Sequence, residues 1–191
     1  MRNRFPALPI NSLFFIVQAF TVMSLSVKGA EDQALEALIT LTLYLLFIYL
    51  EQLWQFKIEN WVRLALILTI IANSGGGHFL GGYNTKYFDK ILHFFGSFSA
   101  ASFAFSVINK IFHVKYSSRA VMFIFISAVG LAIGALYEIL EYSLDRIFLM
   151  NNQLGLSDTN LDLIADALGS LASAVYITFI SGNKTPLTKK V

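Results

Sequence analysis

Six long apolar segments constrain this chain more than any other feature of its sequence. A helix needs about 20 mostly apolar residues to cross the roughly 30 Å hydrocarbon core of a bilayer, and only 14% of the 191 residues are charged. Soluble domains carry about 25%. The sequence therefore predicts an all-α, polytopic membrane protein, a bundle of six transmembrane helices in a single integral membrane domain over residues 1–191. The predicted helices are residues 10–28, 34–55, 61–80, 89–112, 119–144 and 161–181.

Composition excludes several kinds of site and partner. The net charge of +2 is too small for the basic surface of a nucleic-acid-binding protein. The chain has no cysteine, which excludes disulfides and cysteine metal sites. The first apolar segment follows Arg2 and Arg4, as a signal peptide would, but VKGAED (27–32) lacks a small-x-small cleavage site. We therefore expect this helix to be retained.

The basic residues predict an orientation in the cell membrane. With the N-terminus in the cytoplasm and six alternating helices, the short cytoplasmic segments receive ten of the fourteen lysines and arginines. This excess is the positive-inside bias of membrane proteins, and it puts both termini in the cytoplasm. The four basic residues on the outer side are Lys28, Lys86, Lys90 and Arg146.

The acidic residues gather on the opposite, outer side of the membrane. In this topology only Glu51 and Glu59 fall on the inner side, and ten of the twelve acids fall on the outer side. Three of these belong to the connection 28–36, where a solvated loop explains them. The other seven gather at the outer ends of the last three predicted helices, together with His93. They are Asp89, Glu138, Glu141, Asp145, Asp158, Asp162 and Asp166.

Helical spacing predicts that many of these side chains converge. Asp89 and His93 are four residues apart and so share one face of a helix. Stripes of small residues on all three helices end in acids or histidine, and such stripes allow membrane helices to approach closely. We therefore expect an outward-facing acidic pocket. The stripes are Gly96, Ser97, Ala100, Ala101 and Ala104; Ser127, Gly130 and Gly134; and Gly169 and Ser173.

Carboxylates held together must share protons, pair with cations or bind a metal, and a charge at bilayer depth usually marks function. The nearby cations are Lys86, Lys90, Arg146 and a protonated His93. A histidine with carboxylates would suit a divalent cation, Zn²⁺, Mn²⁺ or Mg²⁺, and the spacing does not choose among them. We assign His93, Glu138 and Asp166 as candidate catalytic groups and metal ligands. Candidate substrate-binding residues are Asp89, Glu141, Asp162 and His78.

Structural roles compete with these assignments. Thr159 and Asp162 fit a capping box that would start the last helix. Asp89 in a first helical turn would interact favourably with the helix dipole, and His93 alone would more often be a structural hydrogen-bond partner. His78 stands among glycines in SGGGHFLGGYN (74–84), which suggest a re-entrant or helix-ending loop that could roof the pocket.

Three motifs in order resemble a known family. YFDKILHFFG (87–96), ALYEILEYSLDR (135–146) and SDTNLDLIADALGS (157–170) are similar to the YjdF-like bacterial membrane family of unknown function, and more distantly to VanZ-like proteins. One VanZ-like protein is associated with glycopeptide-antibiotic resistance. Glu141 and Asp166 depart from the VanZ-like pattern, which tends to have Gln and Asn there. The matching positions are Asp89, His93, Phe94, Gly96, Glu138, Glu141, Asp158, Thr159, Asp162 and Gly169.

The sequence thus favours a membrane protein that binds or acts on a lipid-linked or cell-envelope substrate, with a divalent cation as the expected cofactor. A proton-coupled transporter is the first alternative, although the polar residues stop at one side and no inverted repeat is visible. The second alternative is a membrane assembly protein in which acids and lysines only tie helix ends together. The resemblance does not decide among these, because a shared fold does not establish function.

Overall fold

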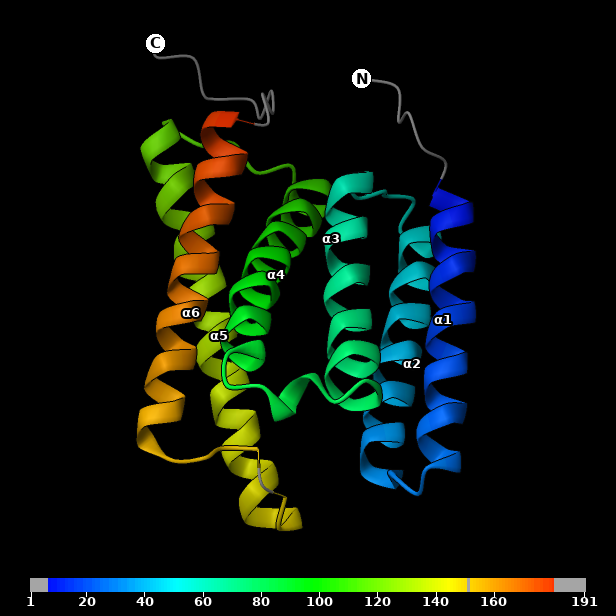
Figure 1. Cartoon of the computed structure of the whole chain (residues 1–191). Coiled ribbons are helices and arrows are strands. Elements are labelled where there is room, and N and C mark those ends of the chain that lie inside the picture. Colours follow the sequence, from blue (N-terminus) through cyan, green and yellow to red (C-terminus); the bar gives the residue numbers. More distant parts are fainter. Residues whose placement is uncertain (1–6, 151, 181–191) are drawn as a thin grey trace. The chain divides into compact units, whose positions relative to one another are not determined.

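The computed structural model describes residues 7–150 and 152–180. All regular elements in these ranges are helices, and six helices are long and apolar enough to cross a membrane, as the sequence predicts (Figure 1). The chain divides into two compact units after Asp89, in the first turn of α4. The single domain predicted from the sequence stays a prediction, and the units are described separately below.

The first unit contains α1, α2 and α3, which continues directly into a π-helical segment. Predicted and observed bounds of these spans differ by a few residues at most. Within the stretch 74–84, expected to form a re-entrant or helix-ending loop, the residues up to Phe79 instead continue the helix with wider π turns, and the chain leaves the helix only at Leu80. The elements are α1 Ala7–Val27, α2 Glu31–Leu53, α3 Asn60–Ile71, η1 Ala72–Phe79 and η2 Gly82–Asn84.

A buried ion pair ties together one end of the first unit. Arg63 on α3 donates to both carboxylate oxygens of Glu51 on α2, at 2.7 and 2.6 Å, and both side chains are buried. Glu51 also accepts from the backbone N–H of Ile58, and Arg63 also donates to the hydroxyl of Tyr44. One cation therefore meets one carboxylate with further hydrogen bonds on both, which is what a buried pair needs to offset its desolvation.

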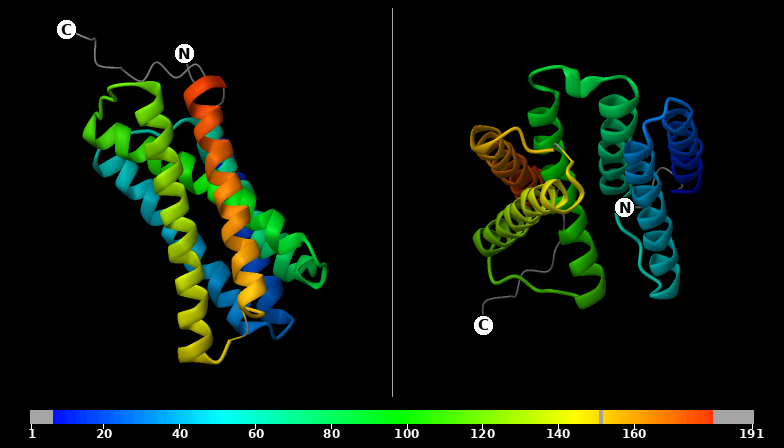
Figure 2. Two further views of the ribbon diagram at one scale, coloured as in Figure 1. Left: turned by 90° about the vertical axis from the view of Figure 1, so that its left-hand side faces the viewer. Right: turned by 90° about the horizontal axis from the view of Figure 1, so that it is seen from below.

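The second unit consists of three long helices and a terminal π-helical turn. α5 and α6 run alongside each other (Figures 1 and 2), and side chains of α4 bond to α6 at several levels. The last helix begins five residues earlier than predicted, and α5 ends four residues later. The elements are α4 Phe88–Phe112, α5 Arg119–Phe148, α6 Leu156–Val175 and η3 Tyr176–Ile180.

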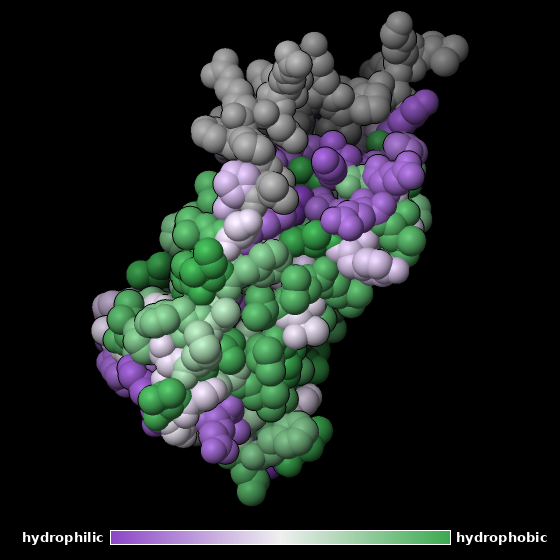
Figure 3. Space-filling model, turned by 90° about the vertical axis from the view of Figure 1, so that its right-hand side faces the viewer, coloured by the Kyte–Doolittle hydropathy of each residue, from purple (hydrophilic) through white to green (hydrophobic). Residues whose placement is uncertain are grey.

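Glycines set the close packing of the second unit. A Cβ on Gly169 of α6 would collide with the backbone carbonyl oxygen of Phe94 on α4, and one on Gly130 of α5 would lie 2.7 Å from the Cβ of Ser170. The sides of the helices remain apolar and exposed, for example at Ile124 and Leu136. Figure 3, seen from the side of α1 and α2 of the first unit, likewise shows apolar residues in the middle of the face and hydrophilic residues toward its ends. Such surfaces suit lipid contact rather than water.

Gly169→Ala should separate α4 from α6. Because the added methyl group meets backbone rather than a movable side chain, we expect the free energy of unfolding to fall by about 1–3 kcal/mol, the usual cost of overpacking. Thermal unfolding of the detergent-purified protein measures the change. Gly75→Ala is the matched control, since its Cβ would find only ordinary contacts at 3.8 Å. Equal melting temperatures for the two variants would show that this close approach does not matter.

Candidate metal centre

Three helices of the second unit bring His93, Glu138 and Asp166 together. One possible ligand atom from each lies within 4.8 Å of the others, and all three residues are buried. His93 Nδ1 is 3.3 Å from Asp166 Oδ1 and 3.7 Å from Glu138 Oε1. The sequence-based prediction that α4, α5 and α6 each contribute a polar group to one cluster thus matches the geometry.

The local sequence explains why these side chains can meet. Glu138 and Gly134 are four residues apart on α5, so they share a face. A Cβ on Gly134 would lie 2.6 Å from Asp166 Oδ2, and therefore only glycine leaves room for this carboxylate against α5. On α4, Ser97 follows His93 by one turn and also faces Asp166.

Hydrogen bonds hold one oxygen of each carboxylate. The Ser97 hydroxyl donates to Asp166 Oδ1 at 2.6 Å. The Gln153 side-chain amide donates to Glu138 Oε2 and to the Glu138 backbone carbonyl, each at 3.0 Å. Glu138 Oε1 and Asp166 Oδ2 are buried and accept no hydrogen bond from the part of the chain that the structure describes. Two buried carboxylate oxygens are thus left with unused acceptor capacity, which is costly in a low-dielectric interior.

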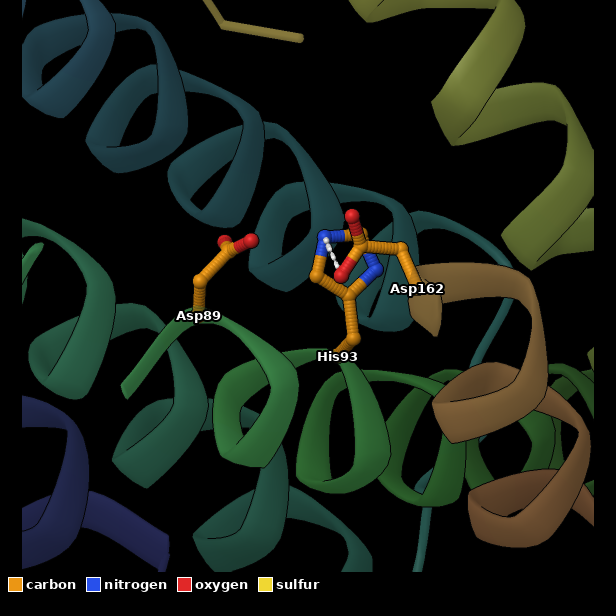
Figure 4. Close-up of side chains that lie close together, drawn as sticks. All are labelled: Asp89, His93 and Asp162. Atoms are coloured by element: carbon orange, nitrogen blue, oxygen red, sulfur yellow. Dashed lines mark ion pairs between the residues drawn. The ribbon is translucent and has the colours of Figure 1, made fainter. Parts of the chain in front are cut away.

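A second group adjoins the first at the start of α4 and α6. Asp89, His93 and Asp162 also bring one ligand atom each within 4.8 Å of the others. Figure 4 shows the Asp162 carboxylate directed at the imidazole of His93, and the distance from Nε2 to Oδ1 is 3.8 Å. Lys90 pairs with Asp162 at 2.7 Å and with Asp158 at 2.5 Å. His93 therefore lies between two sets of carboxylates.

The charges of the cluster do not balance. Lys90 is shared by Asp158 and Asp162, and His93 is shared by Asp162, Glu138 and Asp166. Within the described residues, these ion pairs join Lys90 and His93 to four carboxylates, so each cationic group is shared. Like charges this close must take up protons or a further cation.

Several predicted site residues have other surroundings. The capping box is wrong: α6 begins at Leu156, so Thr159 and Asp162 lie inside the helix, and the cap residue Gly155 offers no side chain. Asp162 is instead 2% exposed and ion-paired. Glu141, one turn beyond Tyr137, is only partly buried and belongs to neither group of possible ligands.

His78 lies in the first unit, in a separate polar cluster. Its Nε2 is 3.0 Å from Glu36 Oε2, and the other oxygen of Glu36 accepts from Asn73 at 2.6 Å. Asn73 in turn accepts from the Tyr83 hydroxyl, and the rings of His78 and Tyr83 lie 4.9 Å apart. The π turns of η1 thus place Asn73 and His78 against α2, a partnership with Glu36 that the sequence did not indicate.

Gln153 is a site residue that sequence reasoning missed. It follows α5 in an irregular connection, where a single neutral amide carries no motif. Asp145 holds this connection in place by accepting the backbone N–H groups of Asn152 and Gln153 at 2.8 and 2.9 Å. An Asp in the last turn of a helix, followed by Asn and Gln, is the one signal that could have suggested such a folded-back connection.

Comparison with known proteins agrees with this architecture. A family model described as "Predicted membrane protein (DUF2238)" matches residues 10–183. The chain belongs to this family. The YjdF-like resemblance refers to the same family. An uncharacterized protein of Thermotoga maritima is 36% identical over 137 residues, which cover 66% of this chain and 67% of that protein. No solved structure matches the chain.

Lys90→Met should destabilise the second unit, because Asp162 would be left buried without this cation. Breaking a buried pair costs about 3–5 kcal/mol; we expect about 2–4 kcal/mol here, since Lys90 remains 19% exposed. Adding Asp162→Asn should restore part of the melting temperature, and the exposed Lys86→Met serves as control. A second substitution that lowers the melting temperature further would contradict the pairing.

Proposed function

We propose that the second unit binds a divalent cation through His93, Glu138 and Asp166, and that the protein uses it to act on a lipid-linked or cell-envelope substrate. The observation that carries the proposal is the convergence of one nitrogen and two carboxylate ligands from three helices, with buried oxygens that lack hydrogen-bond donors. A cation would satisfy these oxygens and remove the excess of negative charge.

The distances suit a metal centre. Metal–nitrogen and metal–oxygen bonds of about 2.0–2.2 Å in a tetrahedral arrangement put neighbouring ligand atoms about 3.4 Å apart. His93 Nδ1 lies 3.7 Å from Glu138 Oε1, which has no donor. It lies 3.3 Å from Asp166 Oδ1, which accepts from Ser97 and is within hydrogen-bond distance of this nitrogen, while Asp166 Oδ2 has no donor. A histidine nitrogen favours Zn²⁺ or Mn²⁺ over Mg²⁺, which prefers oxygen ligands and water.

Neighbouring side chains would hold the ligands in place. Metal-bound histidines usually interact through their other ring nitrogen with a carboxylate, and Asp162 lies at 3.8 Å from Nε2 of His93. Ser97 and Gln153 would orient the two ligating carboxylates through the hydrogen bonds described above. A bound divalent cation would supply Lewis acidity and an activated water, the means by which metalloenzymes hydrolyse esters and phosphoesters.

The predicted orientation puts this centre toward the outer face of the cell membrane, with both termini in the cytoplasm. The positive-inside bias supports it. The more distant resemblance to VanZ-like proteins, one of which is associated with glycopeptide-antibiotic resistance, would fit a role at the cell envelope.

The structure bears on the transporter alternative as well. Buried serines continue along α4 and α6 beyond the acidic cluster, so polar side chains do not stop at one side as the sequence suggested. However, Ser99 donates to the backbone carbonyl of Gly96, and Ser102 bonds with Ser173 and the carbonyl of Phe98. The buried hydroxyl of Ser170 has no hydrogen-bond partner among the described residues. No carboxylate or histidine accompanies the serines Ser99, Ser102, Ser106 and Ser173 among the buried residues described there. We therefore favour the metal centre.

Metal content is the test of the proposal. The purified protein should hold close to one equivalent of Zn²⁺ or Mn²⁺ by elemental analysis, and His93→Ala, Glu138→Gln and Asp166→Asn should each lose it. Added metal should also stabilise the wild type, by about 2.7 kcal/mol at a concentration of 100 times Kd.

The exposed acids Glu31 and Asp32 give matched controls, since Glu31→Gln and Asp32→Asn change the same groups outside the cluster. Both controls should keep the metal. Absence of metal from the wild type, with no rise in melting temperature on adding Zn²⁺ or Mn²⁺, would refute the centre.

Cysteine labelling tests the orientation directly, because the chain contains no cysteine of its own. Lys86 and Lys57 are exposed and lie on opposite sides of the membrane in the predicted topology. Each is replaced by cysteine, as Lys86→Cys and Lys57→Cys. In intact cells a membrane-impermeant maleimide should label only the cysteine at position 86. Permeabilised cells provide the control, in which both should react. Labelling of position 57 alone in intact cells would invert the topology.

A further inference from the structure

An open groove lies beside Glu138, between the end of α5 and the start of α6. It consists of two adjoining shallow depressions of about 530 and 360 Å³, which are largely open and share Tyr142, Gln153 and Thr159 in their walls. Glu138 lines the smaller depression, and Arg146 and Asp145 both line the larger one. The groove therefore leads from a cationic side chain to a ligand of the proposed metal centre.

Arg146 is placed to receive an anion. Its Nε donates to the Tyr142 hydroxyl at 3.3 Å, and its guanidinium carbon lies 5.4 Å from the centre of the Tyr142 ring. Within the described residues, no carboxylate forms an ion pair with this arginine. A guanidinium whose outer N–H groups remain available is well suited to bind a phosphate through two parallel hydrogen bonds.

The neighbouring Asp145 does not cancel this cation by pairing with it. Its Oδ1 accepts from the backbone and side-chain nitrogens of Asn152, at 2.8 and 2.9 Å, and its Oδ2 accepts from the backbone of Gln153 at 2.9 Å. The carboxylate is thus engaged in folding the connection that forms one wall of the groove.

The smaller depression offers an apolar wall. Ala135, Ile139 and Leu163 line it beside Glu138. Ile139 is 59% exposed, and Leu136 and Leu140 next to it are also exposed. The groove therefore combines a cationic end with an apolar side that is open toward the surface expected to contact lipid. This pairing of properties matches an amphiphile with an anionic head rather than a small soluble anion.

We infer that this groove binds an anionic, phosphate-bearing membrane lipid, with Arg146 at the phosphate and the hydrocarbon chain along Ile139 and Leu163. Such a lipid would be the substrate class of the proposed metal centre, so the inference rests in part on the proposed function. Tyr142 lies one turn, roughly 6 Å along the helix axis, from Glu138, and Arg146 lies roughly 12 Å from it. Because Arg146 folds back onto Tyr142, the anion would lie between these limits, on the side of the groove that leads to Glu138.

Lipid retention by the full-length protein tests the inference. In detergent micelles with equal amounts of phosphatidylglycerol and phosphatidylcholine, native mass spectrometry should show preferential binding of phosphatidylglycerol. Arg146→Gln should reduce this preference by about tenfold, the worth of a charged hydrogen bond to phosphate. Arg146→Lys should restore part of it. Arg119→Gln, at the other end of the same helix, should leave it unchanged.

Three outcomes would overturn the inference. They are an absence of preference, a preference unaffected by Arg146→Gln, and equal Arg146-dependent stabilisation by inorganic phosphate, which would indicate a free-phosphate site. The same measurement with EDTA and with His93→Ala separates the two proposals. Lipid preference should persist there, because Arg146 lies outside the metal ligands. The lipid measurement therefore remains interpretable if the protein binds no metal, and the metal measurement remains interpretable if the protein binds no lipid.

Discussion

Repulsion among buried carboxylates is the constraint around which the second unit is organised. Glu138 and Asp166 come from different helices and share one imidazole, while Asp162 is shared between that imidazole and Lys90. Bringing them together requires helices close enough that Gly134 and Gly169 have no room for a side chain. Close helix packing thus holds several carboxylates together, and their negative charge must be neutralised by protons or by a cation. A divalent cation bound between them would supply two positive charges.

The first unit shows how the same chain handles a buried charge that has only a structural role. Arg63 and Glu51 meet one to one, and Tyr44 and the Ile58 amide satisfy further atoms of the pair. In the cluster around His93 the carboxylates share their cations, and one oxygen of Glu138 and one of Asp166 have no donor, whereas in the Arg63–Glu51 pair both carboxylate oxygens accept hydrogen bonds and only Nε of Arg63 lacks a partner among the described residues. This contrast within one protein is the main reason to assign a binding role to the second cluster and a stabilising role to the first.

Much of this architecture could be predicted from the sequence, because hydropathy and small-residue spacing act over whole helices. Those signals located the six spans and the shared polar face of α4, α5 and α6. Partners across irregular connections could not be predicted. Gln153 reaches Glu138 only because Asp145 folds the connection back, and His78 reaches Glu36 only because η1 has π turns. The start of α6 was missed because Gly155 caps it without a side-chain signal.

The most direct test of the central claim compares the thermal stability of the wild type and Asp166→Asn with and without metal. If repulsion defines the cluster, Asp166→Asn should be more stable than the wild type in EDTA, because one of the competing charges is gone. With saturating Zn²⁺ or Mn²⁺ the order should reverse, because only the wild type keeps all three ligands. A variant that is less stable than the wild type by the same amount in both conditions would show that Asp166 serves packing and hydrogen bonding alone.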